Sequence, residues 1–228
     1  ILIWVAAASL FAGGVGALVE KNISRIFSYF IICHIGYMVA GLGMLTEAAL
    51  AGAIFYMMHD IPVKANLFLS SGLIQKIGGA TQIGNLGGLY ATYPMIALLI
   101  AVPLFSVAGI PPLSGFWPKL SLFLAGVDTG QYALIGFMVF GSFITLFVVA
   151  KVWAEVFWKN DPVQDKITKR GVFHTLGARK RQLITAPIIL LALVSLYIGL
   201  GAEQVQQLSL RIAGELLSPQ GYIDAVLK

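Results

Sequence analysis

Three titratable side chains, His59, Asp60 and Lys64, lie close together in one apolar segment of the chain. Asp60 precedes Lys64 by one helical turn, so the two side chains share a face of a helix. An acid at that spacing keeps a lysine charged in apolar surroundings, and the adjacent His59 titrates near neutral pH. We therefore expect these three residues to carry protons. The competing interpretation is an ion pair that only fixes helix packing.

A second lysine, Lys119, follows Pro118 in another apolar segment. Because proline is favoured at the first position of a helix, we expect Pro118 to begin a helix with Lys119 at its amino end. The positive pole of that helix and the loss of water both favour the neutral amine. Lys119 is therefore the second candidate for proton translocation. The alternative is that its side chain extends to the membrane surface.

His34 is a further candidate for proton translocation, although a single histidine in an apolar helix is more often a hydrogen-bonded core residue. The three histidines are far apart in the sequence, and the single cysteine, Cys33, lies in an apolar run. We therefore expect no metal site and no disulfide framework. The sequence also contains no ligand pattern for a quinone, a flavin or an iron–sulfur cluster, so we expect no cofactor.

The composition indicates that membrane helices position these residues. Of the 228 residues, 58% are hydrophobic and 11% are charged, whereas soluble domains contain about 25% charged residues. The mean hydropathy is +0.88. These values exclude a soluble enzyme, a disordered tail and a nucleic-acid-binding module. We expect an all-α, multi-pass membrane protein whose surroundings are the lipid bilayer, with no nucleic-acid partner.

Six apolar runs are long enough to cross the membrane, which takes about 20 residues for about 30 Å of hydrocarbon. They cover approximately residues 1–19, 26–45, 50–74, 94–125, 132–158 and 184–202. The fourth run is too long for one straight crossing, and Gly109, Pro111, Pro112 and Gly115 interrupt it. We predict two half-helices around a break, because irregular backbone persists at membrane depth only where protein covers it or water reaches it. Transporters use such breaks as ion sites.

The chain divides into two parts. We expect residues 1–182 to form one helical unit, identified below as a repeat only through the resemblance, that contains the broken helix at about 94–125 and ends in a basic loop, 159–182. Residues 183–228 form the last transmembrane helix and an amphipathic segment that we expect on the membrane surface. The chain starts inside an apolar run without an initiator Met, so we expect it to begin within a longer protein.

Basic residues occur in alternate loops. Most of the 15 Lys and Arg residues lie in the loops around residues 21–25, 76 and 159–181. The loops between them, 46–49 and 126–131, contain none. By the positive-inside rule, the basic loops face the cytoplasm. We expect the longest of them to contact anionic lipid rather than nucleic acid.

Five motifs, taken in order, resemble those of one family of membrane proteins. They are NISRIFSY (Asn22–Tyr29), HIGY (His34–Tyr37), HDIPVKANLFL (His59–Leu69), LGGLY (Leu86–Tyr90) and AGIPPLSGFWPK (Ala108–Lys119). They are similar to the antiporter-like membrane subunits shared by respiratory complex I and multisubunit Mrp cation/proton antiporters, and most of all to the D-type Mrp subunits. The resemblance extends over essentially the whole chain.

The resemblance implies a fold of fourteen transmembrane helices with two inverted repeats, each containing a broken helix. This chain then corresponds to the second repeat and the helix that follows it, helices nine to fourteen. Lys64 matches the family's lysine on helix eleven, and Lys119 matches the position on broken helix twelve that is Lys or Glu across the family. Pro62 and Pro118 depart from the family pattern, which has aliphatic or small residues there.

The resemblance also implies the function. It suggests a transporter subunit, rather than an enzyme, that moves protons in exchange for Na+ in the bacterial inner membrane. Its partners would be the other Mrp subunits, the lipid bilayer, H+ and Na+. Two alternatives remain open: a proton-pumping membrane subunit of a complex I-like oxidoreductase, and a structural assembly subunit without an ion path of its own.

Overall fold

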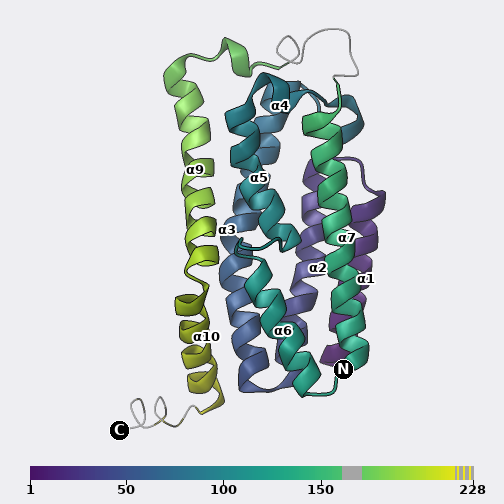
Figure 1. Cartoon of the computed structure of the whole chain (residues 1–228), viewed down its shortest axis with the longest axis vertical. Helices are drawn as coiled ribbons and strands as arrows, with labels where there is room; N and C mark the ends of the chain where they lie inside the picture. The colour runs from purple at the N-terminus through teal and green to yellow at the C-terminus, as the bar shows by residue number, and fades with distance from the viewer. Residues whose placement is uncertain (161–170, 219, 221–222, 224–225, 227–228) are drawn as a thin grey trace.

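Apolar segments separated by short turns give a bundle of long helices whose axes run in roughly the same or opposite directions (Figure 1). The structure is a computed structural model that describes residues 1–160, 171–218, 220, 223 and 226, so part of the predicted basic loop lies outside the described residues. Its α-helices are α1 (Leu2–Val19), α2 (Ile23–Met44), α3 (Glu47–Gly78), α4 (Leu89–Thr92), α5 (Pro94–Ala108), α6 (Phe116–Asp128), α7 (Tyr132–Trp153), α9 (Ala178–Leu200) and α10 (Ala202–Leu217). Short turns of other helix types lie at Ile83–Asn85, Ala154–Trp158 and Phe173–Thr175.

Side-chain caps fix the starts of α2 and α3, the helices that carry His34, His59, Asp60 and Lys64. The Asn22 side chain accepts hydrogen bonds from two backbone N–H groups at the start of α2. The Thr46 hydroxyl accepts the Ala49 N–H at the start of α3. Such caps satisfy donors that a helix cannot pair internally. At the other end of α3, Gly79 has a φ of 68°, a left-handed conformation that glycine adopts without strain.

Four helices of the described part of the chain are long and apolar enough to cross a membrane by themselves: α1, α2, α7 with its following turn, and α9. The two other predicted crossings carry His59, Asp60 and Lys64 in one case and Lys119 in the other. Helix α3 contains His59, Asp60 and Lys64, which lower its hydropathy, and the fourth crossing is divided between α5 and α6. The chain is therefore a multi-pass membrane protein, as its composition predicts.

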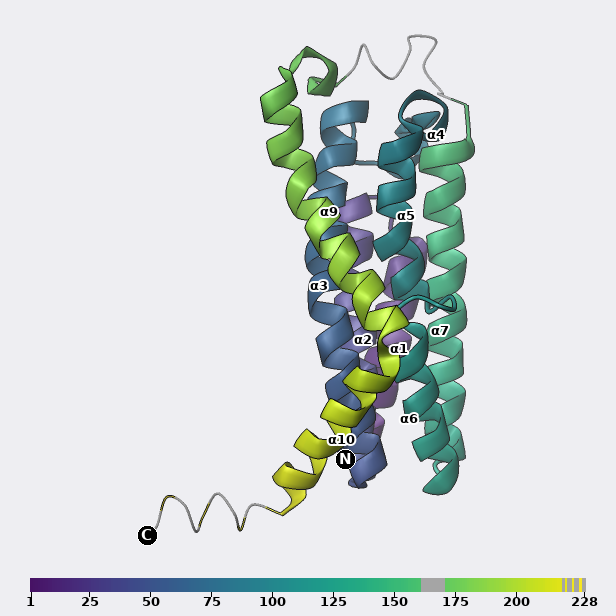
Figure 2. The same ribbon diagram turned by 60° about the vertical axis from the view of Figure 1, so that its left-hand side comes forward.

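Helix α3 lies among α2, α6, α9 and α10 and is covered on several sides (Figures 1 and 2). Its buried side chains point in different directions, and they include Phe55, His59, Val63 and Lys64. Between its two ends, α3 is exposed mainly along one stripe that includes Met57, Ile61 and Leu69, and these side chains are apolar. The helix continues without interruption past Pro62. This setting removes His59, Asp60 and Lys64 from lipid.

The predicted broken helix is confirmed. Helix α5 ends at Ala108, and Gly109 turns the chain with a φ of 84° before α6 begins at Phe116. The interruption lies midway along the bundle (Figure 1). One detail was wrong: Pro118 is the third residue of α6, not the first. The first turn of a helix has backbone N–H groups without helical partners, so proline is tolerated there.

The three basic loops meet at one end of the bundle. Backbone hydrogen bonds join Ile23 N–H to the Thr81 carbonyl, Ile83 N–H to the Lys21 carbonyl, and Gly88 N–H to a carbonyl of the third loop. This is the upper end in Figure 1, opposite the first residue of the chain. The alternation of basic and neutral loops in the sequence therefore corresponds to two ends of the bundle.

Helices α9 and α10 follow one another with a bend at Gly201 (Figure 2). The buried side of α10 contacts α3, where Val205 packs with Phe55 and Ala213 packs with Ala51. Small buried side chains of α10 therefore face α3, whereas Leu208, Leu216 and Leu217 are exposed. The placement of this segment on the membrane surface stays a prediction.

Candidate functional site

Asp60 forms the centre of a buried polar cluster between α2 and α3. Its Oδ1 lies 2.9 Å from Nδ1 of His34 and 3.7 Å from Nζ of Lys64. Asp60, His34 and Lys64 are 6%, 0% and 6% exposed, respectively. A buried carboxylate needs both charge balance and hydrogen bonds to offset the loss of water. Lys64 supplies the charge and His34 supplies the hydrogen bond.

His59 does not join this cluster, although it adjoins Asp60 in the sequence. Consecutive residues of an α-helix point about 100° apart, because the helix has 3.6 residues per turn. His59 therefore faces the break, where its Nδ1 lies 2.8 Å from Oγ of Ser114. Ser114 in turn lies 3.5 Å from Oγ of Ser106 on α5. The predicted trio is thus divided: Asp60 and Lys64 remain together, and His59 connects α3 to the break.

Lys119 reaches back from the first turn of α6 to the end of α5. Its Nζ donates hydrogen bonds to the carbonyls of Val107 (3.2 Å) and Ala108 (3.1 Å), and the residue is 4% exposed. Carbonyls in the last turn of a helix have no helical partner and form its negative pole, which favours a cation. The prediction from the positive pole of α6 was therefore incomplete, because the side chain ends at the opposite pole of the neighbouring half-helix. Gly109 leaves room for it, since a Cβ there would lie 3.1 Å from Cδ of Lys119.

Two tyrosines that the sequence did not single out lie between the cluster and the break. The rings of Tyr37 and Tyr56 stack with centroids 5.0 Å apart. Nζ of Lys119 lies 5.5 Å from the centroid of the Tyr37 ring, and the Tyr56 ring contacts both histidines, with centroids 5.6 Å from His34 and 5.8 Å from His59. Helical spacing could have indicated both tyrosines as neighbours of the candidate residues, because Tyr37 lies one turn after His34 and Tyr56 lies one turn before Asp60.

Four buried polar atoms of this region have no hydrogen-bond partner among the described residues. They are Nε2 of His34, Nε2 of His59, the Tyr56 hydroxyl and Nζ of Lys64. Most buried polar atoms in proteins are paired, so a group of unpaired ones calls for an explanation. Imidazole, phenol and amine groups all exchange protons. The arrangement is therefore suited to proton transfer. The described residues include no group of three or more His, Cys, Asp or Glu that could hold a metal ion.

The chain is similar to known membrane proteins over its whole length. Residues 1–145 match the family described as "NADH:quinone oxidoreductase/Mrp antiporter, TM". The D-type Na(+)/H(+) antiporter protein of Alkalihalophilus pseudofirmus is 37% identical over 100% of this chain and 44% of its own length. The protein of the same name from Bacillus subtilis is 32% identical over the same shares of the two chains.

Solved structures give the same result. A chain of the Mrp complex from Dietzia sp. DQ12-45-1b superposes with a TM-score of 0.86 at 31% identity, covering 100% of this chain and 49% of that one. A chain of the archaeal membrane-bound sulfane sulfur reductase reaches 0.83 at 23% identity, covering 99% of this chain and 44% of that one, which shows a shared fold. The chain thus spans about half the length of the relatives it matches. These similarities and the apolar helices indicate a multi-pass protein of the bacterial inner membrane.

Proposed function

Since the chain belongs to the NADH:quinone oxidoreductase/Mrp antiporter transmembrane family, we propose that it is the proton-translocating part of one subunit of a multisubunit cation/proton antiporter. Its D-type relatives, which are named as Na(+)/H(+) antiporter subunits, support Na+ and H+ as the exchanged ions. The partners are the other subunits of the complex and the surrounding bilayer. Similarity to a chain of the Dietzia Mrp complex supports a place in such an assembly.

Lys64 holds the transferred proton on the α3 side of the path. Its amine lies 3.7 Å from Oδ1 of Asp60 and has no hydrogen-bond partner among the described residues, so its charge is balanced while its hydrogen-bonding positions stay free. His34 keeps Asp60 oriented through the 2.9 Å contact from α2. A proton on this amine is therefore stabilised by a carboxylate that is itself titratable.

Lys119 holds the proton on the α6 side. Two carbonyls at the end of α5 stabilise its ammonium form, and loss of the proton weakens these hydrogen bonds, because a neutral amine is a weaker donor than an ammonium group. Proton exchange at Lys119 is thereby linked to the stability of the break. His59 and Ser114, 2.8 Å apart, join α3 to the break segment.

The observation that carries this proposal is the continuous series of contacts that joins the Asp60–Lys64 pair, through His34 and the stacked rings of Tyr37 and Tyr56, to Lys119. A buried ion pair kept only for packing needs one partner for each charge. Here a second lysine, two histidines and two tyrosines lie in the same buried region, and three of their polar atoms, together with Nζ of Lys64, are unpaired within the described structure. This excess of exchangeable groups favours a transport path over a purely structural subunit.

The test is Lys64→Ala in the complete subunit, assembled in its complex, with Na+/H+ antiport measured in membrane vesicles. We expect normal amounts of complex and a loss of antiport of about 10²-fold or more, the scale for removing a proton-transfer group. Lys76→Ala, at the exposed end of the same helix, is the matched control and should retain activity. Normal antiport by an assembled Lys64→Ala complex would contradict the proposal, and loss of assembly alone would favour the structural alternative.

A further inference from the structure

The last turn of α9 touches the backbone of the break directly. Gly199 is buried there, and a Cβ at this position would lie 2.7 Å from the Pro112 carbonyl oxygen and 2.8 Å from the Ser114 nitrogen. Real Cβ atoms do not approach backbone atoms so closely, so only glycine fits without moving one of the two segments. The position of the break segment is therefore limited by α9 as well as by its own sequence.

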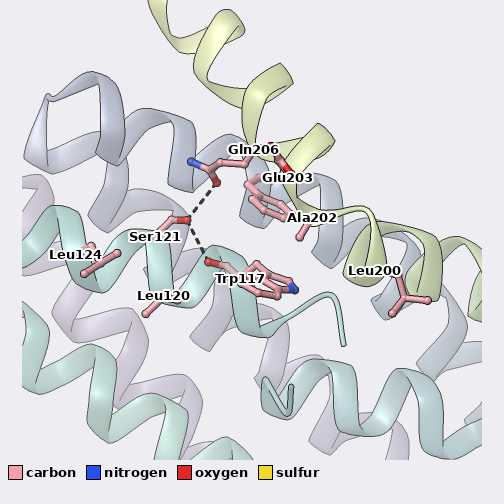
Figure 3. Close-up of a pocket in the computed structure, with 9 residues that line it drawn as sticks. Trp117, Leu120, Ser121, Leu124, Leu200, Ala202, Glu203 and Gln206 are labelled. Carbon is pink, nitrogen blue, oxygen red and sulfur yellow. Dashed lines mark hydrogen bonds between the residues drawn. The ribbon is translucent and has the colours of Figure 1, made fainter. Parts of the chain in front are cut away.

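Hydrogen bonds connect α6 to the same region. Nε1 of Trp117, in the first turn of α6, donates to the Gly199 carbonyl at 2.9 Å. One turn later, the Ser121 hydroxyl lies 3.1 Å from both Oε1 of Gln206 on α10 and the Trp117 carbonyl (Figure 3). Interhelical hydrogen bonds of this kind hold membrane helices together. These contacts attach the start of α6 to α9 and α10.

A cavity of about 360 Å³ lies beside these contacts, between α6 and the α9–α10 bend. Trp117, Leu200, Ala202 and Gln206 are among its lining residues (Figure 3). Close packing therefore does not hold α6 against α10 along this stretch. The attachment depends on the Trp117 and Ser121 hydrogen bonds and on the tight contact at Gly199, which are the points where a substitution can release it.

Ser114 links this attachment to the proposed proton path. The backbone nitrogen of Ser114 faces Gly199, whereas its hydroxyl lies 2.8 Å from Nδ1 of His59 on α3. The break segment is thus held between α3 and α9. Lys119 follows Trp117 by two residues in the same first turn, so a displacement of that turn also moves the lysine.

We propose that Gly199 and Trp117 are positioning residues, which hold the break segment so that Ser114 reaches His59 and Lys119 reaches the end of α5. The inference rests on the proposed proton path. Neither residue exchanges protons itself. Because a misplacement of about 1 Å can cost about 10²-fold in the rate of a positioned reaction, both residues affect transport without touching the ion.

The test is a double-mutant cycle in the assembled antiporter, with antiport measured against pH and divided by the amount of complex. Gly199→Ala should lower antiport by about 5- to 100-fold, and Trp117→Phe, which keeps the ring but loses the N–H donor, by a smaller factor. In a Ser114→Ala background, Gly199→Ala should cause a clearly smaller loss than it causes alone, because part of its effect acts through the contact between Ser114 and His59. Gly136→Ala, which has no atom within 4 Å of the new Cβ, and Trp4→Phe, at an exposed position, are the matched controls.

The outcomes separate this inference from the proposed function. Multiplicative losses from Gly199→Ala and Ser114→Ala, with an unchanged pH profile, would overturn the inference, because they indicate a general structural effect. So would activity equal to that of the controls in both Gly199→Ala and Trp117→Phe. If Gly199→Ala prevents assembly, Trp117→Phe takes its place in the cycle with Ser114→Ala, and the same two outcomes would overturn the inference. Full antiport in both Ser114→Ala and Lys119→Ala would instead refute the proton path on which the inference rests.

Discussion

The two buried lysines are stabilised in different ways. Lys64 faces a carboxylate side chain on its own helix, whereas Lys119 faces two backbone carbonyls at the end of a different helix. The carboxylate of Asp60 can itself gain a proton and has a hydrogen bond from His34. The carbonyls cannot change charge, and their strength as acceptors depends on where α5 ends.

This difference indicates that the two sites respond to different changes. The charge of Lys64 depends on the protonation of neighbouring side chains, so electrostatic changes elsewhere in the protein affect it directly. The charge of Lys119 depends on the geometry of the break, so conformational changes affect it directly. At Lys119, a substitution that preserves the positive charge should therefore be tolerated only if it also preserves the contact with the end of α5.

The largest expected effect in this comparison is that of Lys119→Arg. Arginine keeps the positive charge and can still donate to carbonyls, but it does not lose its proton under physiological conditions. We expect antiport to fall by about 10²-fold at every pH tested, nearly as far as with Lys119→Ala. The measurement is antiport in vesicles with matched complex content.

Lys151→Arg is the matched control for that variant, because Nζ of Lys151 also donates to a carbonyl near the end of a helix, that of Leu18, away from the break. It should transport normally. Lys119→Glu tests whether a titratable group of either charge is sufficient, as the family pattern at this position suggests. Wild-type activity of Lys119→Arg across the pH range would eliminate proton release at Lys119 and leave the contact to α5 as a structural one.

Asp60→Asn should have an intermediate effect. The amide oxygen can still accept a hydrogen bond from His34, but the charge that balances Lys64 is lost. We expect antiport to decrease about tenfold and its optimum to move to lower pH, because the protonated lysine is less stable without the carboxylate. Glu47→Gln, at the exposed start of the same helix, serves as the control. A loss of assembled complex with unchanged activity per complex would show instead that the pair is structural.

The smallest effect should come from His34→Gln. Glutamine retains an N–H donor for Asp60 but cannot exchange a proton, so the two roles of His34 are separated. If His34 only orients Asp60, this variant keeps activity within about twofold while His34→Leu loses about tenfold, the value of one hydrogen bond to a charged group. His174→Gln, in the exposed loop, is the control. Equal losses in the Gln and Leu variants would place His34 in the proton path itself.

Much of the fold could be predicted from the sequence. Long apolar runs require helices that satisfy their own backbone hydrogen bonds in lipid, and the glycines and prolines of the fourth run require a break. The pairing of Asp60 with Lys64 also follows from local spacing alone. These features depend on residues within a few positions of one another, and the structure agrees with them.

The tertiary structure decided which groups from different helices meet. Nothing local indicates that His34 bonds Asp60, that His59 turns to Ser114, or that Gly199 limits the position of the break. The side chain of Lys119 shows the reason most clearly. Sequence order places it at the positive end of α6, but the loop at the break leaves the negative end of α5 beside the first turn of α6, within 3.2 Å of the lysine amine. Local spacing determines the face on which a residue lies, whereas its partner depends on how the helices pack.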